Sequence, residues 1–453
     1  MMIPTSIRSF VVRIVSFPTI VLAMLGVGVS IGAFTLSLAG YLPVTSLIGT
    51  PVSAATAEDL PMSAAEDVGM SAERLHRIDN VISRAMDAKQ ISGAVTLVAR
   101  RGKIAHFEAH GLMDVESGRA MKKDTIFPIA SMTKPVAGVA ILMLVEEGKV
   151  RLSDSVSMFI PEFHDTQVAV RRSRNGDDSS GTYTVPADRE ITVRDLLTHT
   201  SGLGSGGAGS QKTSRIAPRR LDDDLEAYTK ELGAAPLDFQ PGTRWAYSGL
   251  AGIDTVARIV EVASGLTFDE FLRLRIFEPL GMFDTGFNVP TERTSRVVML
   301  YGRTSSGLER REVPAWVATA TLFSGGGGLW STAGDYVKFA QMLVNRGELD
   351  GVRILGSKTV ELMASNHVGD LYAQAGRVGG ASGKGFGLTV DVVLNDVAAQ
   401  DNRSTGSFGW SGAFGTTFWV DWQEEMTAIL MVQTPGGPLR ADFQNAVRQA
   451  IID

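Results

Sequence analysis

The chain has 453 residues, enough for one large catalytic body of two lobes or for two ordinary domains, and its 44% hydrophobic and 20% charged residues exclude an intrinsically disordered protein. A formal net charge of −6 without a basic run gives no reason to expect a nucleic-acid partner. The absence of cysteine from the sequence excludes disulfides, a thiol nucleophile, thiolate metal sites and a cysteine-linked lipid anchor.

A long uncharged segment follows the first basic residues. Arg8 and Arg13 precede residues 14–57, which hold no charged residue, and residues 17–38 alone reach the roughly 20 apolar residues that cross a bilayer. Small residues at 53–57 resemble a signal-peptide cleavage region. Residues 1–57 are therefore predicted to be a cleaved signal peptide or a retained N-terminal membrane anchor. Because basic residues stay on the cytoplasmic side, both alternatives place the body outside the cytoplasm. With a cleaved signal peptide the body would be periplasmic or secreted, and with a retained anchor it would be attached to the inner membrane.

The body, residues 58–453, begins with a helix and a hairpin. Ser71 is a candidate N-cap for a helix with one apolar face, made of Leu75, Ile78, Val81, Ile82 and Ala85. Residues 93–99, Gly-Ala-Val-Thr-Leu-Val-Ala, are typical of a buried strand. Arg101 and Gly102 supply a turn, and residues 104–110 are predicted to be the returning strand.

The C-terminal end repeats this pattern. Residues 416–420 and 426–433 are predicted strands, and Leu439, Phe443, Val447, Ala450 and Ile451 mark one face of a closing helix. Hairpins at both ends, each beside a helix, predict an α+β fold: one antiparallel sheet built from the two chain ends and flanked by helices.

The middle of the chain differs in composition from both ends. Helical patterns at 193–197, 250–264 and 268–277 are separated by polar and glycine-rich loops. The predicted organisation is an α/β lobe of about residues 66–150 plus 330–453 and a mainly helical lobe of about 150–330. Two loops, 171–188 and 202–220, are either surface excursions or a lid over a cleft between the lobes.

The residues with the clearest chemical pattern are Ser131 and Lys134. An apolar run, residues 136–145, follows Pro135, which helices tolerate in their first turn but not in their interior. Ser131 is therefore predicted to lie at the start of a buried helix, with Lys134 on the same face and the positive end of the helix dipole beneath it. Burial favours the neutral form of a lysine, so this pair is predicted to be a nucleophile and its base. Of the chain's lysines, only Lys134 has a serine three residues before it.

Other nucleophile and metal patterns are weaker. Residues 409–413, Gly-Trp-Ser-Gly-Ala, narrowly miss the G-x-S-x-G elbow and lack the strand-to-helix context that the elbow requires. The six histidines show no metal-ligand spacing, and His106 and His110 are interpreted as surface residues of a strand. We expect no metal and no cofactor.

Four motifs, in order along the chain, resemble the serine β-lactamase-like hydrolases. They are Ser131-Met132-Thr133-Lys134, Leu196-Leu197-Thr198-His199-Thr200-Ser201-Gly202-Leu203, Pro241-Gly242-Thr243 leading to Tyr247-Ser248, and Pro279-Leu280-Gly281-Met282. This group contains class C β-lactamases, D-Ala-D-Ala carboxypeptidases and family VIII carboxylesterases. The resemblance covers roughly residues 68–450 and implies the β-lactamase/DD-peptidase-like fold.

The resemblance also implies roles for individual residues. Ser131 would be the nucleophile, Lys134 its base, and Tyr247 the group that shuttles a proton between nucleophile and leaving group. The family's third motif, usually Lys-Thr-Gly, falls on Trp410-Ser411-Gly412. The backbone N–H groups of Ser131 and Ala413 would then form the oxyanion hole. Residues 324–328 and His199 are interpreted as structural.

Two departures from the family pattern concern the substrate. Trp410 replaces the lysine that binds the substrate carboxylate in β-lactamases and D-Ala-D-Ala peptidases, and Gly249 replaces an asparagine that holds the acyl amide. A tryptophan at the third motif resembles the family VIII carboxylesterases instead.

The primary hypothesis is therefore an esterase on small to medium acyl esters. The alternatives are β-lactam or D-Ala-D-Ala peptide hydrolysis, and a catalytically silent penicillin-binding-like protein. The expected partner is a small-molecule ester or β-lactam-like compound, and membrane association is expected only if residues 1–57 are retained as an anchor.

Overall fold

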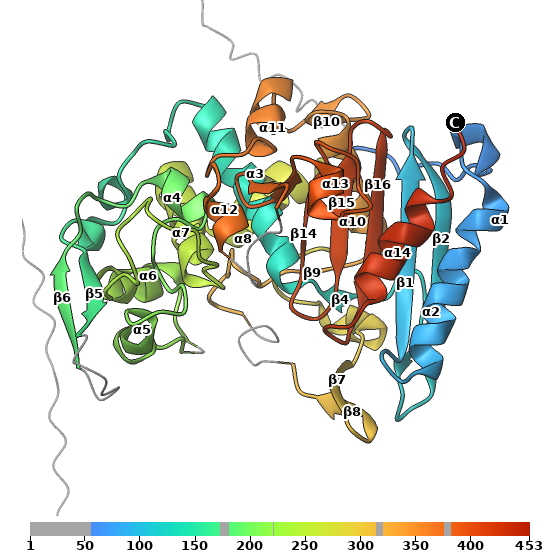
Figure 1. The fold of residues 1–453 in the computed structure, drawn as a ribbon, viewed down its shortest axis with the longest axis horizontal. Coiled ribbons are helices and arrows are strands. Elements are labelled where there is room, and N and C mark those ends of the chain that lie inside the picture. Colours follow the sequence, from blue (N-terminus) through green and yellow to red (C-terminus); the bar gives the residue numbers. More distant parts are fainter. Residues whose placement is uncertain (1–55, 173–180, 221, 314–319, 376–381) are drawn as a thin grey trace, which may run out of the picture. The chain divides into compact units, whose positions relative to one another are not determined.

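Strands from the two ends of the chain meet inside one antiparallel sheet of eight strands (Figure 1). In order across the sheet these are β12 (Lys384–Phe386), β13 (Asp391–Val393), β14 (Phe408–Ser411), β15 (Thr417–Asp421), β16 (Met426–Val432), β1 (Gly93–Arg100), β2 (Lys103–Asp114) and β3 (Arg119–Ala120). β1 lies antiparallel to β16, with Ala94 opposite Val432 and Arg100 opposite Met426. The predicted sheet and its α+β class are confirmed.

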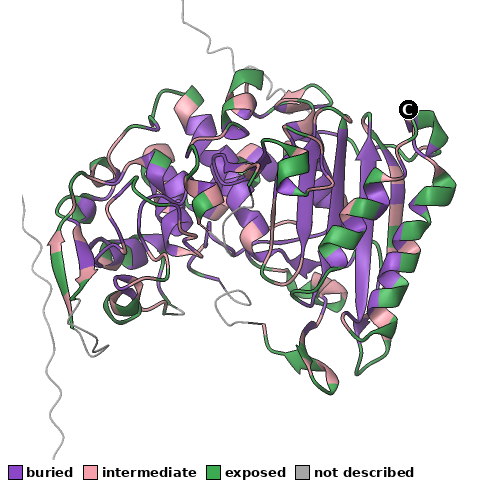
Figure 2. Cartoon of the chain, viewed as in Figure 1, coloured by how far each residue is buried: buried purple, intermediate pink, exposed green. Residues whose placement is uncertain are grey.

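Helices cover both faces of this sheet, and alternate residues of β1 serve the two layers. Ala94 and Val98 are buried with α1 (Ala72–Leu75), α2 (Arg77–Asp87) and α14 (Leu439–Arg448). Val95 and Leu97 face the main core, to which α3 (Thr133–Glu146) and α10 (Ala333–Val344) contribute. Figure 2 shows the consequence, buried strands between helices whose outer faces are exposed. Ser71 caps α1 as predicted, but the predicted single helix is divided at His76.

The helical part of the chain lies beyond α3, on the other side from β1 and β2 (Figure 1). It contains α4 (Val193–Leu197), α5 (Ser210–Ile216), α6 (Leu225–Gly233), α7 (Ala251–Ser264) and α8 (Phe268–Leu272), which continues as a π-helical turn (Arg273–Phe277). The helices predicted at 193–197, 250–264 and 268–277 are confirmed. α7 packs against α3, so the helix that begins beside Ser131 has neighbours from both parts of the fold.

Both predicted loops contain regular structure, so their description as plain loops was wrong. β5 (Gln167–Arg171) pairs with β6 (Thr182–Pro186), because valine residues in β5 and threonine, tyrosine and valine residues in β6 supply strand-forming side chains. α5 lies within the 202–220 segment. Shorter elements complete the fold: β4 (Phe127–Pro128) with β9 (Trp330–Ser331), β7 (Leu300–Thr304) with β8 (Gly307–Arg311), β10 (Glu348–Leu349) with β11 (Val352–Arg353), α11 (Ser357–Met363), α12 (Leu371–Gln374) and α13 (Asp396–Ala399).

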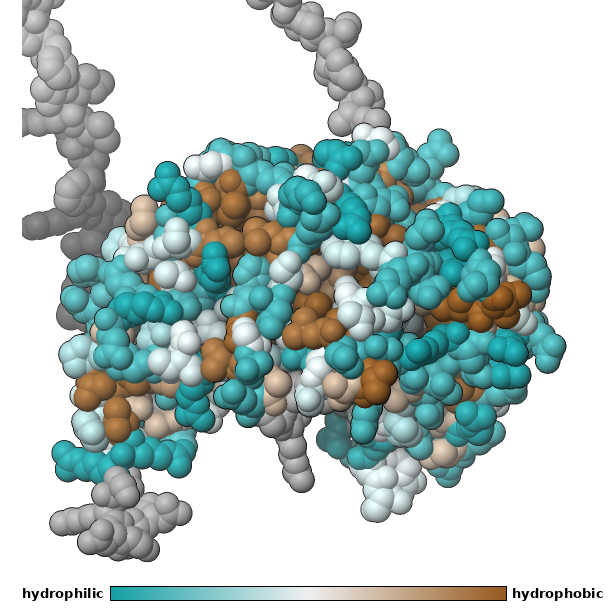
Figure 3. All heavy atoms as spheres, turned by 45° about the horizontal axis from the view of Figure 1, so that its top comes forward, coloured by the Kyte–Doolittle hydropathy of each residue, from teal (hydrophilic) through white to brown (hydrophobic). Residues whose placement is uncertain are grey.

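The structure, a computed structural model, describes residues 56–172, 181–220, 222–313, 320–375 and 382–453. The predicted signal or anchor segment lies outside these ranges except for Thr56 and Ala57, and Ala57 N–H donates to the carbonyl of Pro279 (2.9 Å). Within the described ranges, no helix combines the length and apolar character needed to cross a membrane. On the face shown in Figure 3, hydrophobic residues form several separate patches among hydrophilic ones.

Candidate active site

Ser131 lies in a tight turn directly before α3. Residues Ala130–Met132 form a single 3-10 turn, and Pro135 occupies the first turn of the helix, as the sequence predicted. Ala130 has φ of 45°, a left-handed conformation that costs a non-glycine residue about 1 kcal/mol. Strain of this kind persists where the surrounding structure enforces it, and here it sets the direction of the half-buried Ser131.

The Lys134 side chain is completely buried and reaches Ser131. Its Nζ lies 3.1 Å from Ser131 Oγ, 2.6 Å from the Gly249 carbonyl oxygen and 2.5 Å from the Gly326 carbonyl oxygen. No carboxylate of the described residues lies within 4.0 Å of this amine. The two carbonyl oxygens and Ser131 Oγ are three hydrogen-bond acceptors around the amine, so one of its N–H groups points at the serine oxygen.

Tyr247 approaches Ser131 from the other side. Its hydroxyl donates to Ser131 Oγ at 2.7 Å, and Lys134 Nζ lies 5.0 Å from the centroid of its ring. Burial raises the pKa of the Tyr247 phenol, but the charge of Lys134 and the polar contacts of the hydroxyl, including its hydrogen bond to Ser131 Oγ, outweigh burial and lower the pKa overall. Ser131 Oγ is therefore in hydrogen-bond contact with both an amine and a phenol.

His199 holds the segment that carries Tyr247. The imidazole is fully buried, its Nδ1 accepts from the N–H of Ser248 (3.3 Å), and its ring centroid lies 4.8 Å from that of Tyr247. Burial and the nearby charge of Lys134 lower the pKa of His199 well below its ordinary value, so the ring is neutral. These contacts agree with its interpretation as a structural residue.

Asp254, which no sequence motif indicated, supports the glycine loop that contacts Lys134. Its Oδ1 accepts from Ser324 Oγ (2.6 Å) and from the N–H of Gly326 (3.0 Å), and its Oδ2 pairs with the Arg219 guanidinium. The loop lies tight against α7, since a Cβ on Gly326 would stand 2.7 Å from the Cα of Leu250. The only sequence signal for this role is an aspartate within the apolar face of α7.

The third motif lies at the end of β14, beside the turn that contains Ser131. A Cβ on Gly412 would stand 2.3 Å from the Ile129 carbonyl oxygen, so only glycine allows this approach. The N–H group of Ala413 has no acceptor among the described residues, and Ser131 lies at the start of its 3-10 turn, where backbone N–H groups have no partner within the turn. Their freedom is what an oxyanion site requires. β14 turns back into β15 instead of entering a helix, so residues 409–413 are not a nucleophile elbow.

Trp410 and Ser411 face different surroundings. The Trp410 ring packs 5.6 Å from Tyr247 and 5.3 Å from Phe386, measured between centroids. Ser411 Oγ bonds Thr417 Oγ1 at 2.8 Å and accepts from Arg440 at 3.0 Å. The third motif thus has an apolar ring where the family has lysine, with a cation from α14 one residue further on.

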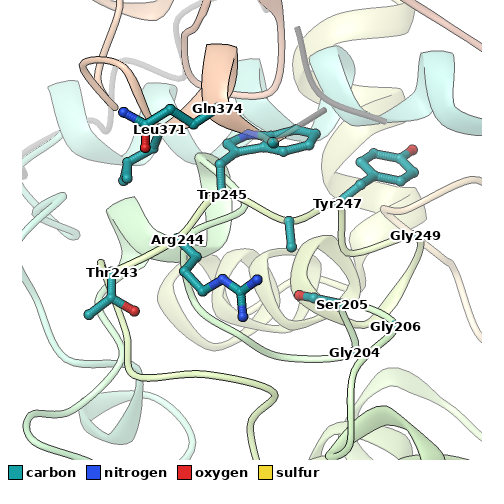
Figure 4. Close-up of a pocket in the computed structure, with 12 residues that line it drawn as sticks. Gly204, Ser205, Gly206, Thr243, Arg244, Trp245, Tyr247, Gly249, Leu371 and Gln374 are labelled. Atoms are coloured by element: carbon teal, nitrogen blue, oxygen red, sulfur yellow. The ribbon is translucent and has the colours of Figure 1, made fainter. Parts of the chain in front are cut away.

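A cavity of about 610 Å³ lies beside Tyr247 (Figure 4). It is lined by residues of three segments, 204–206, 243–249 and 371–375. Tyr247 and Gly249 belong to its wall, so the cavity adjoins the segment that carries the phenol in contact with Ser131. Its volume falls within the range of small-molecule pockets, roughly 300–1,000 Å³.

The interpretation of His106 as a surface residue was wrong. It is only 8% exposed, and its Nε2 lies 2.8 Å from Thr96 Oγ1 on the neighbouring strand. Burial lowers the pKa of His106 to about 4. The reason is its place in β2: it lies opposite Val98 of the fully buried strand β1.

Comparison with known proteins agrees with this fold. EstCE1, described as a hydrolase with promiscuous acyltransferase activity, superposes with a TM-score of 0.70 at 24% identity, over 83% of this chain and 99% of that one. Protein Rv1367c of Mycobacterium tuberculosis (strain ATCC 25618 / H37Rv) is 36% identical over 362 residues, 78% of this chain and 88% of its own. Esterase EstB of Burkholderia gladioli is 30% identical over 398 residues, 82% of this chain and 94% of its own.

The fold is therefore that of the β-lactamase-like and penicillin-binding-protein-like serine hydrolases. The sequence model of the Beta-lactamase family matches residues 78–451, and the chain belongs to that family. Among its relatives are esterases, an acyltransferase and carboxypeptidase-like proteins.

Proposed function

We propose that the protein is a carboxylesterase that hydrolyses small to medium acyl esters through an acyl-enzyme on Ser131. The observation that carries this proposal is the position of Ser131 Oγ, 3.1 Å from the Lys134 amine and 2.7 Å from the Tyr247 hydroxyl. A serine hydroxyl becomes an effective nucleophile only when a base within hydrogen-bond reach accepts its proton.

In the proposed mechanism, Ser131 Oγ attacks the ester carbonyl and its proton passes to Lys134. The carbonyl oxygen becomes an oxyanion and accepts hydrogen bonds from the free N–H groups of Ser131 and Ala413. As the tetrahedral intermediate collapses, Tyr247 donates a proton to the departing alcohol and recovers one from Lys134. Water then attacks the acyl-enzyme by the reverse sequence, which releases the acid and restores the Ser131 hydroxyl.

The surroundings of the site favour esters over amides. Trp410 presents an apolar ring beside Tyr247, and Gly249 offers no side-chain amide for a peptide or β-lactam. An alcohol also leaves more readily than an amine. The relationship to a protein named as an esterase from Burkholderia gladioli supports the same choice.

The direct test is turnover of 4-nitrophenyl butyrate by Ser131→Ala, with Ser306→Ala, in the exposed turn between β7 and β8, as the control. We expect Ser131→Ala to lose at least about 10³-fold in kcat/KM, and Ser306→Ala to retain full activity. A fluorophosphonate should add one mass label to the wild type, located on Ser131. Turnover or labelling preserved in Ser131→Ala would refute the assignment, and a wild type that never labels would indicate a silent penicillin-binding-like protein.

A second candidate is hydrolysis of a β-lactam or a D-Ala-D-Ala peptide. The observation in its favour is Arg440, which donates to Ser411 Oγ and so brings a positive charge to the third motif despite Trp410. The ratio of kcat/KM for 4-nitrophenyl butyrate to that for a chromogenic cephalosporin decides between the two candidates. In the esterase, Trp410→Lys should shift this ratio toward the cephalosporin.

We also propose that the body acts outside the cytoplasm. The support is the uncharged stretch 14–57 behind Arg8 and Arg13. Fractionation of cells that express the full chain tests this proposal, and mature N-terminal sequencing distinguishes a cleaved signal from a retained anchor.

A further inference from the structure

We infer that the cavity beside Tyr247 binds the carboxylate of an anionic ester substrate, with Arg244 as the group that recognises it. This inference rests on the proposed function and specifies its substrate class. It concerns the distal end of the substrate, away from the ester that reacts at Ser131.

Arg244 lies close to the reacting groups along the chain. It precedes Tyr247 by three residues, and the segment between them is neither helix nor strand. Because an extended residue spans at most about 3.6 Å, the Cα atoms of Arg244 and Tyr247 are no more than about 11 Å apart. Both residues line the same cavity of about 610 Å³. In Figure 4 the Arg244 guanidinium extends toward Ser205, below the rings of Trp245 and Tyr247.

The charge of Arg244 is not neutralised by the protein around it. No hydrogen bond or ion pair joins it to another residue in the part of the chain that the structure describes, and no acidic residue lines the cavity. Its contact is with an aromatic face: the guanidinium carbon lies 5.8 Å from the centroid of Phe239. This contact uses none of the guanidinium N–H groups, and the geometry of those groups suits a carboxylate.

A neighbouring arginine shows the contrast. Arg189 comes within 2.4 Å of the place where a Cβ on Gly242 would stand, but its guanidinium already makes two bonds to Asp195, at 2.6 and 2.9 Å. The guanidinium of Arg189 is therefore paired within the protein, whereas the N–H groups of Arg244 are available to a ligand.

The rest of the wall suits a hydrocarbon chain between the ester and the anion. Trp245, Leu371 and Ala375 supply apolar surface, and Ser205 and Gln374 supply polar groups. An ester with a short methylene spacer and a terminal carboxylate would use both the apolar wall and the cation. The anion can belong to the acyl part or to the alcohol part, and the two sources are separated by experiment.

The test compares pairs of substrates that differ in one charge. On the acyl side these are the 4-nitrophenyl half-esters of glutarate and adipate against neutral alkanoate esters of equal length. On the alcohol side they are butyrate esters of 4-hydroxybenzoate and of its methyl ester. The readout is the anionic-to-neutral ratio of kcat/KM, which does not depend on the fraction of folded enzyme.

We expect Arg244→Gln to lower this ratio about tenfold on at least one side, mainly through KM, and Arg244→Lys to retain part of the preference. In the wild type the ratio should also fall as salt increases from 0.05 to 0.5 M, about the range in which screening shortens electrostatic reach severalfold.

Arg84→Gln is the matched control, since Arg84 is an exposed arginine of α2 that does not line the cavity. Unchanged ratios in Arg244→Gln on both sides overturn the inference, as does an equal loss in Arg84→Gln. Failure of the proposed function is a separate result: Ser131→Ala would then still turn over both members of each pair, whatever Arg244→Gln does.

Discussion

Asp254→Asn is the most informative perturbation outside the reacting groups. Asp254 is fully buried, and its carboxylate connects the glycine loop, through Ser324 and Gly326, to the guanidinium of Arg219. Asparagine keeps the shape of the side chain, and its amide oxygen can still accept from the N–H of Gly326. The substitution removes the negative charge that pairs with Arg219 and replaces one carboxylate oxygen by an N–H₂ donor.

The expected loss of stability follows from the burial of this pair. Removing one partner of a buried ion pair costs about 3–5 kcal/mol. Unfolding entropy is about 2.1 cal/mol/K per residue, so for a compact unit spanning residues 54–453 a loss of 4 kcal/mol lowers Tm by about 5 °C. Ser324→Ala removes only the neutral hydrogen bond to Asp254, about 1 kcal/mol, and should lower Tm by about 1 °C.

The activity prediction depends on one further contact. Gly326 donates to Asp254 and accepts from Lys134, so a displaced loop changes the position of the amine relative to Ser131. Asp254→Asn should therefore lower kcat for 4-nitrophenyl butyrate about 10- to 100-fold at 20 °C, where the variant is folded, with little change in KM. Differential scanning calorimetry and steady-state kinetics on the same preparations measure both effects. An Asp254→Asn variant that loses stability but keeps its kcat would show that the loop does not position Lys134.

Three further outcomes are expected. Tyr247→Phe should lower kcat/KM for esters about 10²–10⁴-fold with an unchanged Tm, and a loss below tenfold would exclude proton transfer by this phenol. Gly249→Asn should fold normally, because a Cβ at this position meets no atom within 4 Å, and should raise cephalosporin turnover relative to ester turnover. His106→Gln should make the free energy of unfolding less sensitive to acid. The pKa of His106 is about 4 in the folded protein and about 6.5 in the unfolded chain, so the unfolded state binds the proton first as the pH falls. Between pH 7 and pH 4 the wild type should therefore lose about 3 kcal/mol more of its free energy of unfolding than the variant. Parallel urea titrations at both pH values measure this difference, and equal losses would contradict it.

Local pattern was enough for the ends of the chain. The apolar face from Leu75 to Ala85 and the largely apolar strand that begins at Gly93 determine their own periodicity, and the structure reproduces both except for the division of the helix at His76. The strand at 182–186 was missed because its polar threonines and exposed positions read as a loop, and pairing with β5 supplies what the local pattern lacks. His106 was misplaced for a related reason, since its burial comes from packing on the sheet and not from its own hydropathy.

The sequence by itself determined where Ser131 and Lys134 lie relative to each other. Pro135 marks the start of the helix, and two residues three positions apart at a helix start can lie only on the same face. Contacts between distant segments were decided only by tertiary structure: Tyr247 stands 116 positions from Ser131, and Gly326 stands 192 positions from Lys134. Only the tertiary structure shows that Asp254 supports the glycine loop. The same holds for Arg244, which forms no ion pair with another described residue. Short-range geometry follows from backbone stereochemistry, whereas long-range contacts depend on how the whole core packs, which no local pattern contains.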